Sequence, residues 1–253
     1  MNDAAYLSAH RSHDVPFLLK RWHAVARAAR LKVETVHVSS GHPVIFLHTP
    51  SVDQPRLYLS AGVHGDEPAP VSALLEWAEE NVMLLRRLTV ALFPLFNPAG
   101  LALNTRADHR HIDLNRRFHD ASHPHIKAWW RCIGDMTFTT AVCLHEDYDA
   151  QGTYCYELNR SSRPFLADAA LRACDHIIPR DAQRTIEGRR AIDGIIRRKQ
   201  IPDLPGLPEA IALYLHSTER SLTFETPSEF SLADRVAAHK ALLTAIAAQL
   251  SPE

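Results

Sequence analysis

The sequence predicts an α/β protein in which a mostly parallel central sheet is covered by helices on both faces, a three-layer α/β/α arrangement. Short apolar segments rich in β-branched residues alternate along the chain with longer segments whose apolar residues have helical spacing. Alternation of this kind is typical of a sheet buried under two helical layers. No repeat or low-complexity stretch breaks the pattern. We therefore expect one domain over residues 1–253, with residues 1–15 poorly ordered.

The helices are predicted from amphipathic segments. Residues 17–31 carry apolar side chains at helical spacing directly after Pro16, and proline is favoured in the first turn of a helix. Residues 71–88 form the next such segment, with Leu74, Leu75 and Leu85 on one stripe. The remaining helices are expected at residues 128–136, 164–174 and 232–250.

Strands are predicted where apolar and β-branched residues run together without helical spacing. Residues 183–208 interrupt the alternation with three prolines, and we expect them to form an excursion near the surface and not a domain boundary. The predicted strands are residues 33–38, 44–47, 56–61, 89–95, 139–144, a short strand near Ile177, and 222–225.

Composition and charge narrow the function classes. The 253 residues are 46% hydrophobic and 23% charged, as in a soluble globular protein. Twenty-eight Lys plus Arg oppose 29 Asp plus Glu, so nothing favours nucleic acid or an anionic membrane as the partner. The apolar runs are too short for a membrane-spanning helix, and the first residues lack a secretory pattern, so we expect a cytoplasmic protein. The four cysteines show no Cys-x-x-Cys pairing and are expected to be free thiols.

Two polar clusters supply candidate metal ligands. Each directly follows a predicted strand, and open α/β sheets build their sites at the carboxyl ends of strands. The first contains His64 and Glu67, and the second begins at His145. Two histidines and a glutamate form a catalytic zinc set that leaves the fourth position for water. Alone, either cluster also fits a capped helix start or a buried histidine, and other ligands are on offer from Glu146, Asp147 and Asp149.

Two further clusters supply candidate groups for substrate. Arg106, Arg110 and Arg116 lie within eleven positions, and a guanidinium binds a carboxylate bidentately. Asp113 can accept a hydrogen bond from a metal-bound histidine, although the same residues also suit a solvated polar loop. Glu225 ends a short hydrophobic strand, where burial raises the pKa of a carboxyl and makes it a candidate general base.

In their order along the chain, these motifs resemble the zinc carboxypeptidase family of the carboxypeptidase A type. The resemblance is closer to its small bacterial members and to the neighbouring succinylglutamate desuccinylase/aspartoacylase group. It implies the zinc-peptidase type of mixed, mostly parallel sheet. The matching motifs are His64-Gly-Asp-Glu67, Asn97-Pro-Ala-Gly100, Arg106, Asp113-Leu-Asn-Arg116, His145 and Phe224-Glu-Thr226.

Carried over to this sequence, the resemblance implies one zinc ion bound by His64, Glu67 and His145. Glu225 is then expected to take the proton of the zinc-bound water and to deliver it to the leaving amine. The other expected roles are polarisation of the scissile carbonyl by Arg106, binding of the substrate carboxylate by Asn115 and Arg116, and orientation of a zinc histidine by Asp113.

The sequence departs from the family at three points. His111 stands where many relatives have glycine. A tyrosine covers the site in larger members, and the nearest candidate by position is Tyr214, with Tyr148, Tyr154 and Tyr156 as others. The acidic residues after His145 lead us to expect that Glu146 or Asp147 orients a ligand or meets a cationic group of the substrate.

The sequence therefore predicts a zinc-dependent metallocarboxypeptidase that hydrolyses the amide bond next to a free C-terminal carboxylate. The alternatives are an N-acyl-amino-acid deacylase and a non-catalytic module that binds zinc or amino acids. A short peptide or an acylated amino acid is the expected substrate. Neither a Gly-x-Ser-x-Gly motif nor a P-loop or Gly-x-Gly-x-x-Gly fingerprint is present to support serine-hydrolase or nucleotide chemistry.

Overall fold

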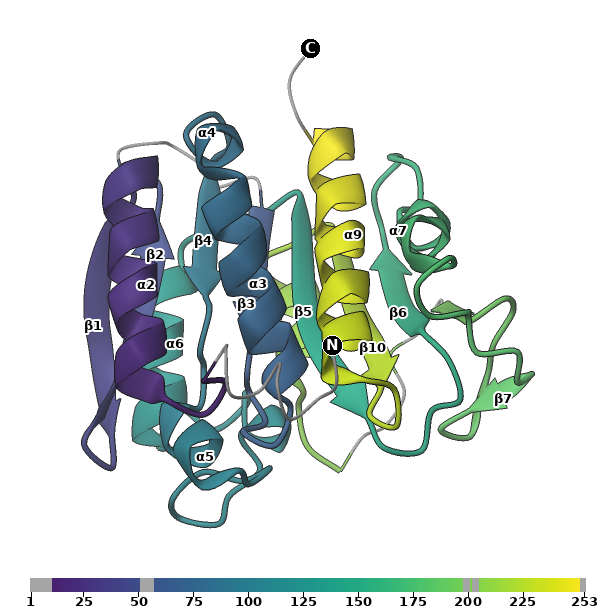
Figure 1. The fold of residues 1–253 in the computed structure, drawn as a ribbon. Coiled ribbons are helices and arrows are strands. Elements are labelled where there is room, and N and C mark those ends of the chain that lie inside the picture. Colours follow the sequence, from purple (N-terminus) through teal and green to yellow (C-terminus); the bar gives the residue numbers. More distant parts are fainter. Residues whose placement is uncertain (1–10, 51–56, 198–200, 202–204, 251–253) are drawn as a thin grey trace.

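The computed structural model describes residues 11–50, 57–197, 201 and 205–250 of the chain. Its centre is an eight-stranded sheet in the order β1-β2-β4-β3-β5-β10-β6-β9, and Figure 1 shows the helices that flank it. The strands β4, β3, β5 and β10 are parallel neighbours, and the mixed, mostly parallel sheet that we expected is confirmed. The strands are β1 (Lys32–Ser39), β2 (His42–His48), β3 (Leu57–Ala61), β4 (Val90–Phe93), β5 (Thr140–Asp147), β6 (Tyr154–Asn159), β9 (Ile195–Arg197) and β10 (Arg220–Pro227).

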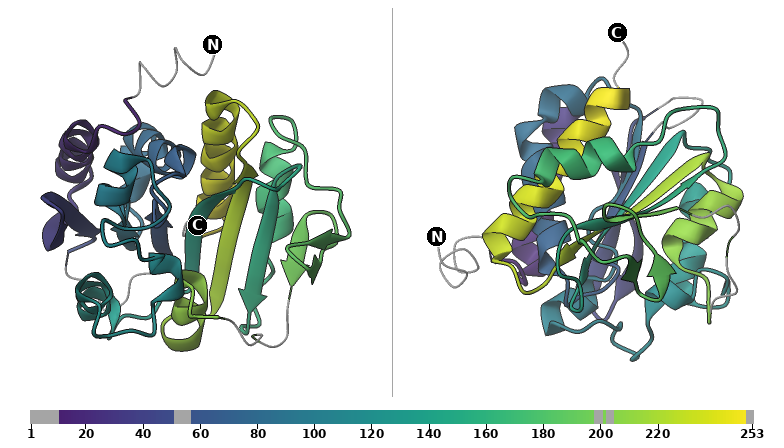
Figure 2. Two further views of the ribbon diagram at one scale, coloured as in Figure 1. Left: turned by 90° about the horizontal axis from the view of Figure 1, so that it is seen from below. Right: turned by 90° about the vertical axis from the view of Figure 1, so that its right-hand side faces the viewer.

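Helices cover both faces of the sheet, as the view along it in Figure 2 shows. Four of them share one apolar core with the sheet: α2 (Val15–Ala29), α3 (Pro68–Glu80), α7 (Ala167–Cys174) and α9 (Leu232–Leu250). Residues of α6 (Pro124–Ile133) and α8 (Glu209–His216) form a second core on the opposite face. Short helices α4 (Val82–Leu85), α5 (Pro98–Leu103) and η1 (Leu114–Arg116) lie in the connections, and β7 (Thr185–Ile186) and β8 (Arg189–Arg190) form a separate hairpin.

The side chains of β5 and β10 alternate between these two cores. Val142 and Leu144 of β5 belong to the core that contains α9, whereas Ala141 and Cys143 belong to the core of α6 and α8. Because successive side chains of a strand point to opposite faces, the next residue, His145, lies on the α8 face and Glu146 on the α9 face. The same alternation in β10 separates Glu225 from Thr226.

The N-terminal helix begins earlier than the sequence pattern indicates. The Asp14 side chain accepts a hydrogen bond from Phe17 N (2.9 Å) and caps α2, and Arg30 ends the helix in the left-handed region. Of the fifteen N-terminal residues expected to be poorly ordered, residues 1–10 lie outside the described residues, and residues 11–13 form a turn before the cap.

Three other expectations are corrected. The strand near Ile177 is absent, because the N–H groups of Ile177 and Ile178 bond to the Cys174 carbonyl in a turn that follows α7. The excursion at residues 183–208 is not confined to the surface, since it supplies β9, which pairs with β6 in the main sheet. The predicted helix at residues 71–88 is two helices, α3 and α4, separated at Asn81. None of the helices within the described ranges is long and apolar enough to cross a membrane.

Candidate metal centre

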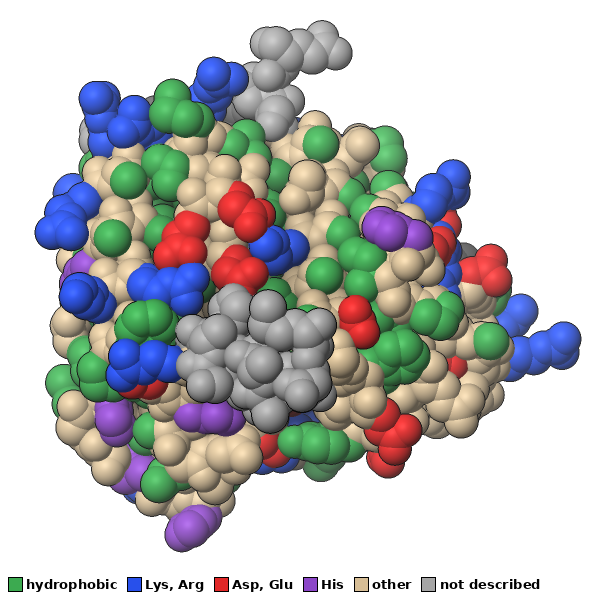
Figure 3. Space-filling view, viewed as in Figure 1, with side chains coloured by type: hydrophobic (Ala, Val, Ile, Leu, Met, Phe, Trp, Pro, Cys, Tyr) green, Lys and Arg blue, Asp and Glu red, His purple; other side chains and the backbone are tan. Residues whose placement is uncertain are grey.

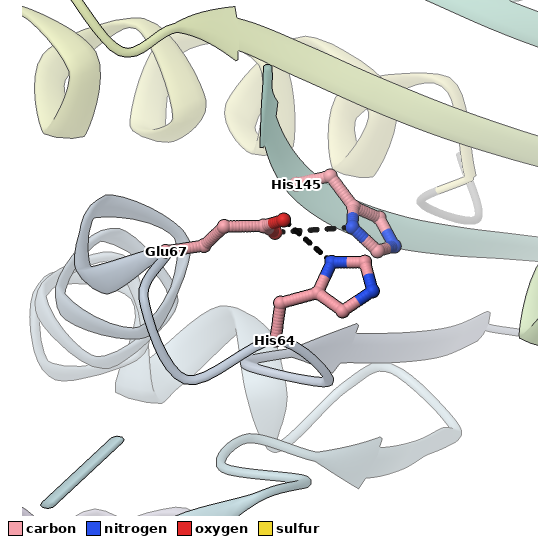
Figure 4. A group of neighbouring side chains, drawn as sticks. All are labelled: His64, Glu67 and His145. Carbon is pink, nitrogen blue, oxygen red and sulfur yellow. Dashed lines mark hydrogen bonds and ion pairs between the residues drawn. The ribbon is translucent and has the colours of Figure 1, made fainter. Parts of the chain in front are cut away.

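The three predicted metal ligands meet at the carboxyl ends of β3 and β5. His64 lies in the turn after β3, Glu67 directly before α3, and His145 near the end of β5 (Figure 4). His64 Nδ1 lies 2.5 Å from Glu67 Oε1, and His145 Nδ1 lies 3.1 Å from Glu67 Oε2. One ligand atom from each residue lies within 4.8 Å of the others, so the Nδ1 atoms and the carboxylate face one common point.

The turn that carries His64 is held by a close contact with α5. A Cβ added at Gly65 would lie 2.0 Å from the carbonyl carbon of Gly100, so only glycine fits there. Asn97 caps α5 by accepting a hydrogen bond from Gly100 N (3.0 Å). The Asn97-Pro-Ala-Gly100 motif therefore packs against the turn that carries His64 and contributes no metal ligand.

The Glu67 carboxylate is directed to the histidines and not to its own helix. Glu67 occupies the N-cap position of α3, yet its side chain makes no capping hydrogen bond. Pro68 opens the helix without an N–H group to satisfy, and Ala69 N donates to Glu146 Oε1 (2.6 Å). The Glu67 oxygens therefore do not cap the helix and face His64 and His145, and Oε2 also accepts a hydrogen bond from Glu146 N (3.2 Å).

Burial and charge at this centre favour a cation. All three residues are buried, with His64 2%, Glu67 1% and His145 4% exposed. Burial works to lower the pKa of His64, but the Glu67 carboxylate and Asp113 overcome it and raise that pKa to about 9. The pKa of Glu67 is held well below its ordinary value, because the two histidines outweigh the effect of burial. Two imidazoles and a carboxylate around one point match the ligand set of a catalytic zinc, so the residues present fit one such ion.

Asp113 contacts His64 as expected. Asp113 Oδ1 lies 3.2 Å from His64 Nε2, the ring nitrogen that faces away from Glu67. Asp113 also accepts hydrogen bonds from Asn115 N (2.9 Å) and Arg106 Nε (3.1 Å). A carboxylate that binds the outer nitrogen of a ligand histidine fixes its tautomer and leaves Nδ1 free for a metal.

Glu225 lies directly beside His145, because β10 pairs with β5 in parallel and the two residues are register partners. Its side chain is on the same face of the sheet. Burial raises the pKa of Glu225 well above its ordinary value, and the carboxylates of Glu67, Glu187 and Asp147 add to the increase against the opposing effect of His145.

The predicted substrate-binding residues lie on the segment that carries Asp113. Arg106 forms ion pairs with both Asp113 and Glu67, and its Nη1 lies 3.7 Å from Glu67 Oε1. Its side chain is 44% exposed. Asn115 Oδ1 accepts a hydrogen bond from Glu209 N (2.9 Å), which leaves the amide nitrogen of Asn115 as a donor. Arg116 Nη1 donates to the Asn115 carbonyl (3.1 Å), and the guanidinium makes no ion pair with a carboxylate of the described residues.

The structure gives the conformation or contacts of three residues at which the sequence departs from the family pattern. His111 adopts a positive φ of 60°, the left-handed conformation that favours glycine. Tyr214 lies in α8 with the Arg160 guanidinium stacked on its ring at 5.1 Å. Tyr148 is exposed, and its hydroxyl donates to the Asp66 carbonyl (3.2 Å), next to a metal ligand.

Two buried carboxylates near the metal centre, Glu209 and Glu146, have partners that the sequence analysis did not predict. Glu209 accepts hydrogen bonds from Tyr58 Oη (2.5 Å) and Ser60 Oγ (2.9 Å). Glu146 forms an ion pair with Arg235 of α9. The acidic run after His145 had singled out Glu146, but nothing in the sequence marks Glu209 or the partner of either group, because each partner lies on an element far away along the chain.

Comparisons with known proteins agree with this arrangement. Residues 53–129 match the sequence model of the succinylglutamate desuccinylase/aspartoacylase catalytic domain, and no curated protein matches the chain. A candidate metallopeptidase from Shewanella amazonensis has a similar structure, with a TM-score of 0.84 and 22% identity over 96% of this chain and 95% of that one.

Two carboxypeptidase structures share the fold at lower similarity. The metallo-carboxypeptidase of Burkholderia cenocepacia has a TM-score of 0.66 and 16% identity over 91% of this chain and 67% of its own. The metallo-carboxypeptidase of Pseudomonas aeruginosa, in complex with (2-guanidinoethylmercapto)succinic acid, has a TM-score of 0.62 and 18% identity over 90% and 68%. The resemblance predicted from the motifs is confirmed: the chain has the zinc carboxypeptidase-like fold, with a His-Glu-His site for one metal ion.

Proposed function

We propose that this protein is a zinc-dependent metallocarboxypeptidase that hydrolyses the amide bond next to a free C-terminal carboxylate. The observation that carries the proposal is the adjacency of Glu225 to the His64–Glu67–His145 site, through the register of β10 with β5. A module that only binds zinc needs no such carboxylate. Its presence beside the ligands supports an enzyme.

A zinc ion at this site supplies a Lewis acid that lowers the pKa of water and polarises a carbonyl. The Glu225 carboxylate accepts the proton of the attacking water and passes it to the leaving amine nitrogen. The role requires a carboxylate next to the metal ligands, and Glu225 is the register partner of His145. No covalent intermediate with the protein is required.

Arg106 and Arg116 are proposed to bind different groups of the substrate. The Arg106 guanidinium lies beside Glu67 and can stabilise negative charge on the oxygen of the scissile carbonyl. Asn115 offers an amide N–H donor and Arg116 a cation without an ion-pair partner in the described part of the chain. Together they suit the terminal carboxylate of a substrate, which a guanidinium can bind with two hydrogen bonds.

A deacylase of N-acyl amino acids is the second candidate, and the match of residues 53–129 to the desuccinylase/aspartoacylase domain favours it. The fold that the chain shares with metallopeptidase and carboxypeptidase structures supports the peptidase.

The test is a product assay by mass spectrometry on zinc-loaded protein. The panel contains short peptides and N-acetyl, N-succinyl and N-formyl amino acids, each with a free and an amidated C-terminus. We expect release of C-terminal residues from peptides with a free carboxylate only. Release of small acids from the acyl amino acids identifies a deacylase instead.

Two glutamine variants separate catalysis from metal binding. Glu225→Gln is expected to abolish turnover while it leaves the zinc content unchanged, because Glu225 is no ligand. The matched control is Glu229→Gln, a change of the same chemistry at an exposed position four residues later. Wild-type turnover by the Glu225 variant would exclude Glu225 as the base.

A further inference from the structure

Two polar side chains of α9, Arg235 and His239, lie one helical turn apart and reach the ends of neighbouring strands. Residues four apart lie on the same side of a helix. Arg235 bonds to Glu146 of β5, and His239 bonds to Thr226 of β10. Glu146 and Thr226 are themselves register partners. Each directly follows a residue of the proposed active site.

The first contact reaches the metal ligands. Glu146 has a side chain only 1% exposed, and its Oε2 accepts a hydrogen bond from Arg235 Nη1. Its Oε1 accepts a hydrogen bond from Ala69 N (2.6 Å), and its own N–H donates to Glu67 Oε2 (3.2 Å). Glu146 is covalently joined to His145. Glu146 therefore connects the two segments that carry Glu67 and His145. The ion pair with Arg235 holds the Glu146 side chain in place from α9.

The second contact reaches the proposed base. Thr226 Oγ1 and His239 Nε2 are 3.1 Å apart in a hydrogen bond, and both residues are fully buried. Thr226 follows Glu225 in β10, and side chains alternate between the two faces of a strand. His239 therefore holds the strand on the α9 face while Glu225 points to the metal site on the other face.

Attachment of α9 to its neighbour does not require these contacts. Lys240 bonds to Glu76 (3.2 Å) and Glu80 (2.5 Å) of α3, and Figure 3 shows acidic and basic side chains gathered where α3 and α9 meet at the surface. A buried ion pair is in general a poor way to stabilise a fold, because the loss of hydration cancels most of the attraction. The buried pair of Glu146 and Arg235 therefore calls for another reason.

We propose that α9 is a positioning element of the active site, in which Arg235 sets the spacing of the metal ligands through Glu146, and His239 sets the position of Glu225 through Thr226. The inference rests on the proposed function. It predicts that the two contacts have different consequences, one for metal affinity and one for turnover. A merely structural role would change neither independently of stability.

The first test measures the zinc dissociation constant by competition with a chromophoric chelator. Loss of a partner that orients a metal ligand costs about ten- to a hundredfold in affinity, and we expect a loss of this size in Arg235→Met. The double variant Glu146→Gln, Arg235→Met removes both charges, so no unpaired charge stays buried, and it should lose affinity to a similar extent. Lys240→Met is the control on the same helix, with an unchanged dissociation constant.

The second test uses Thr226→Val, which keeps the shape of the side chain and removes its hydrogen bond to His239. We expect the zinc dissociation constant to stay within about twofold while kcat falls about tenfold at constant KM. Wild-type zinc affinity in both Arg235 variants overturns the first half of the proposal, and an unchanged kcat in Thr226→Val overturns the second. Failure of the wild-type protein to bind zinc refutes the proposed function instead, which keeps the two failures distinct.

Discussion

Replacement of Glu209 tests how much its buried hydrogen bonds to Tyr58 and Ser60 contribute to the stability of the fold. The Glu209 side chain lies between α8 and β3, where it accepts hydrogen bonds from Tyr58 Oη (2.5 Å) and Ser60 Oγ (2.9 Å). Tyr58 Oη in turn accepts one from Trp129 Nε1 (2.8 Å). The residue is only 1% exposed, so water cannot replace the carboxylate as acceptor.

The expected cost follows from the number of donors left without a partner. Each unsatisfied buried donor costs about 1–3 kcal/mol, so Glu209→Ala, which strands two of them, should lower the free energy of unfolding by about 2–6 kcal/mol. Glu209→Gln keeps one acceptor oxygen and strands one donor, which gives about 1–3 kcal/mol. Urea denaturation at 25 °C measures both. Equal losses in the two variants, or no loss in either, would refute the hydrogen-bond account.

The same site predicts a pH dependence. Burial raises the pKa of Glu209 above its ordinary 4.5, against the opposing hydrogen bonds from Tyr58 and Ser60. The folded state therefore holds this proton more tightly than the unfolded state, and the resulting stability is present below pH 4.5 and is lost as the pH rises towards the folded pKa. Glutamine does not titrate, so the stability difference between the wild type and Glu209→Gln should shrink with increasing pH. A difference that grows over this range contradicts the raised pKa.

Three further outcomes are expected. Arg116→Met should lower kcat/KM for peptides with a free carboxylate by about tenfold or more, since a hydrogen bond to a charged group contributes about 1.5–3 kcal/mol, and should leave amidated analogues unchanged in the same assay. His111→Gly should raise the free energy of unfolding by about 0.5–1 kcal/mol in urea titrations, because the left-handed conformation costs a histidine about 1–2 kcal/mol and the added freedom of the unfolded chain offsets part of the gain. Zinc at a hundred times its dissociation constant should stabilise the protein by about 2.7 kcal/mol in thermal melts and EDTA should reverse this, whereas Glu67→Gln should show almost no response.

The parts of the fold that the sequence predicted are those with a strong local pattern. The helices α2 and α9 and the strands β3, β4 and β5 were predicted because their apolar residues repeat with a clear period or run together. The strand β6 was missed, because its buried Glu157 interrupts the apolar pattern. That carboxylate is satisfied by Arg197 and by the N–H groups at the start of α7, which are contacts from other elements.

The metal centre was predictable for a similar reason. His64 and Glu67 lie three residues apart in one turn, and His145 follows an apolar strand, so residue type and local position were enough to nominate them. The partners of Glu146 and Glu209 were not predictable. Arg235 lies 89 residues after Glu146, and Tyr58 lies 151 residues before Glu209. Only the packing of α9 and α8 on opposite faces of the sheet brings these pairs together.

The order of the strands explains how residues far apart in the sequence meet at this site. The strands β3, β5 and β10 are adjacent and parallel, and their carboxyl ends carry His64, His145 and Glu225 in the same order. Neighbouring strands lie about 4.8 Å apart, so the register of β10 with β5 places the backbones of Glu225 and His145 side by side. A slip of one residue between β5 and β10 would turn Glu225 to the α9 face and destroy the site. The hydrogen bond between Thr226 and His239 on the opposite face opposes this slip, because it is lost in every other register.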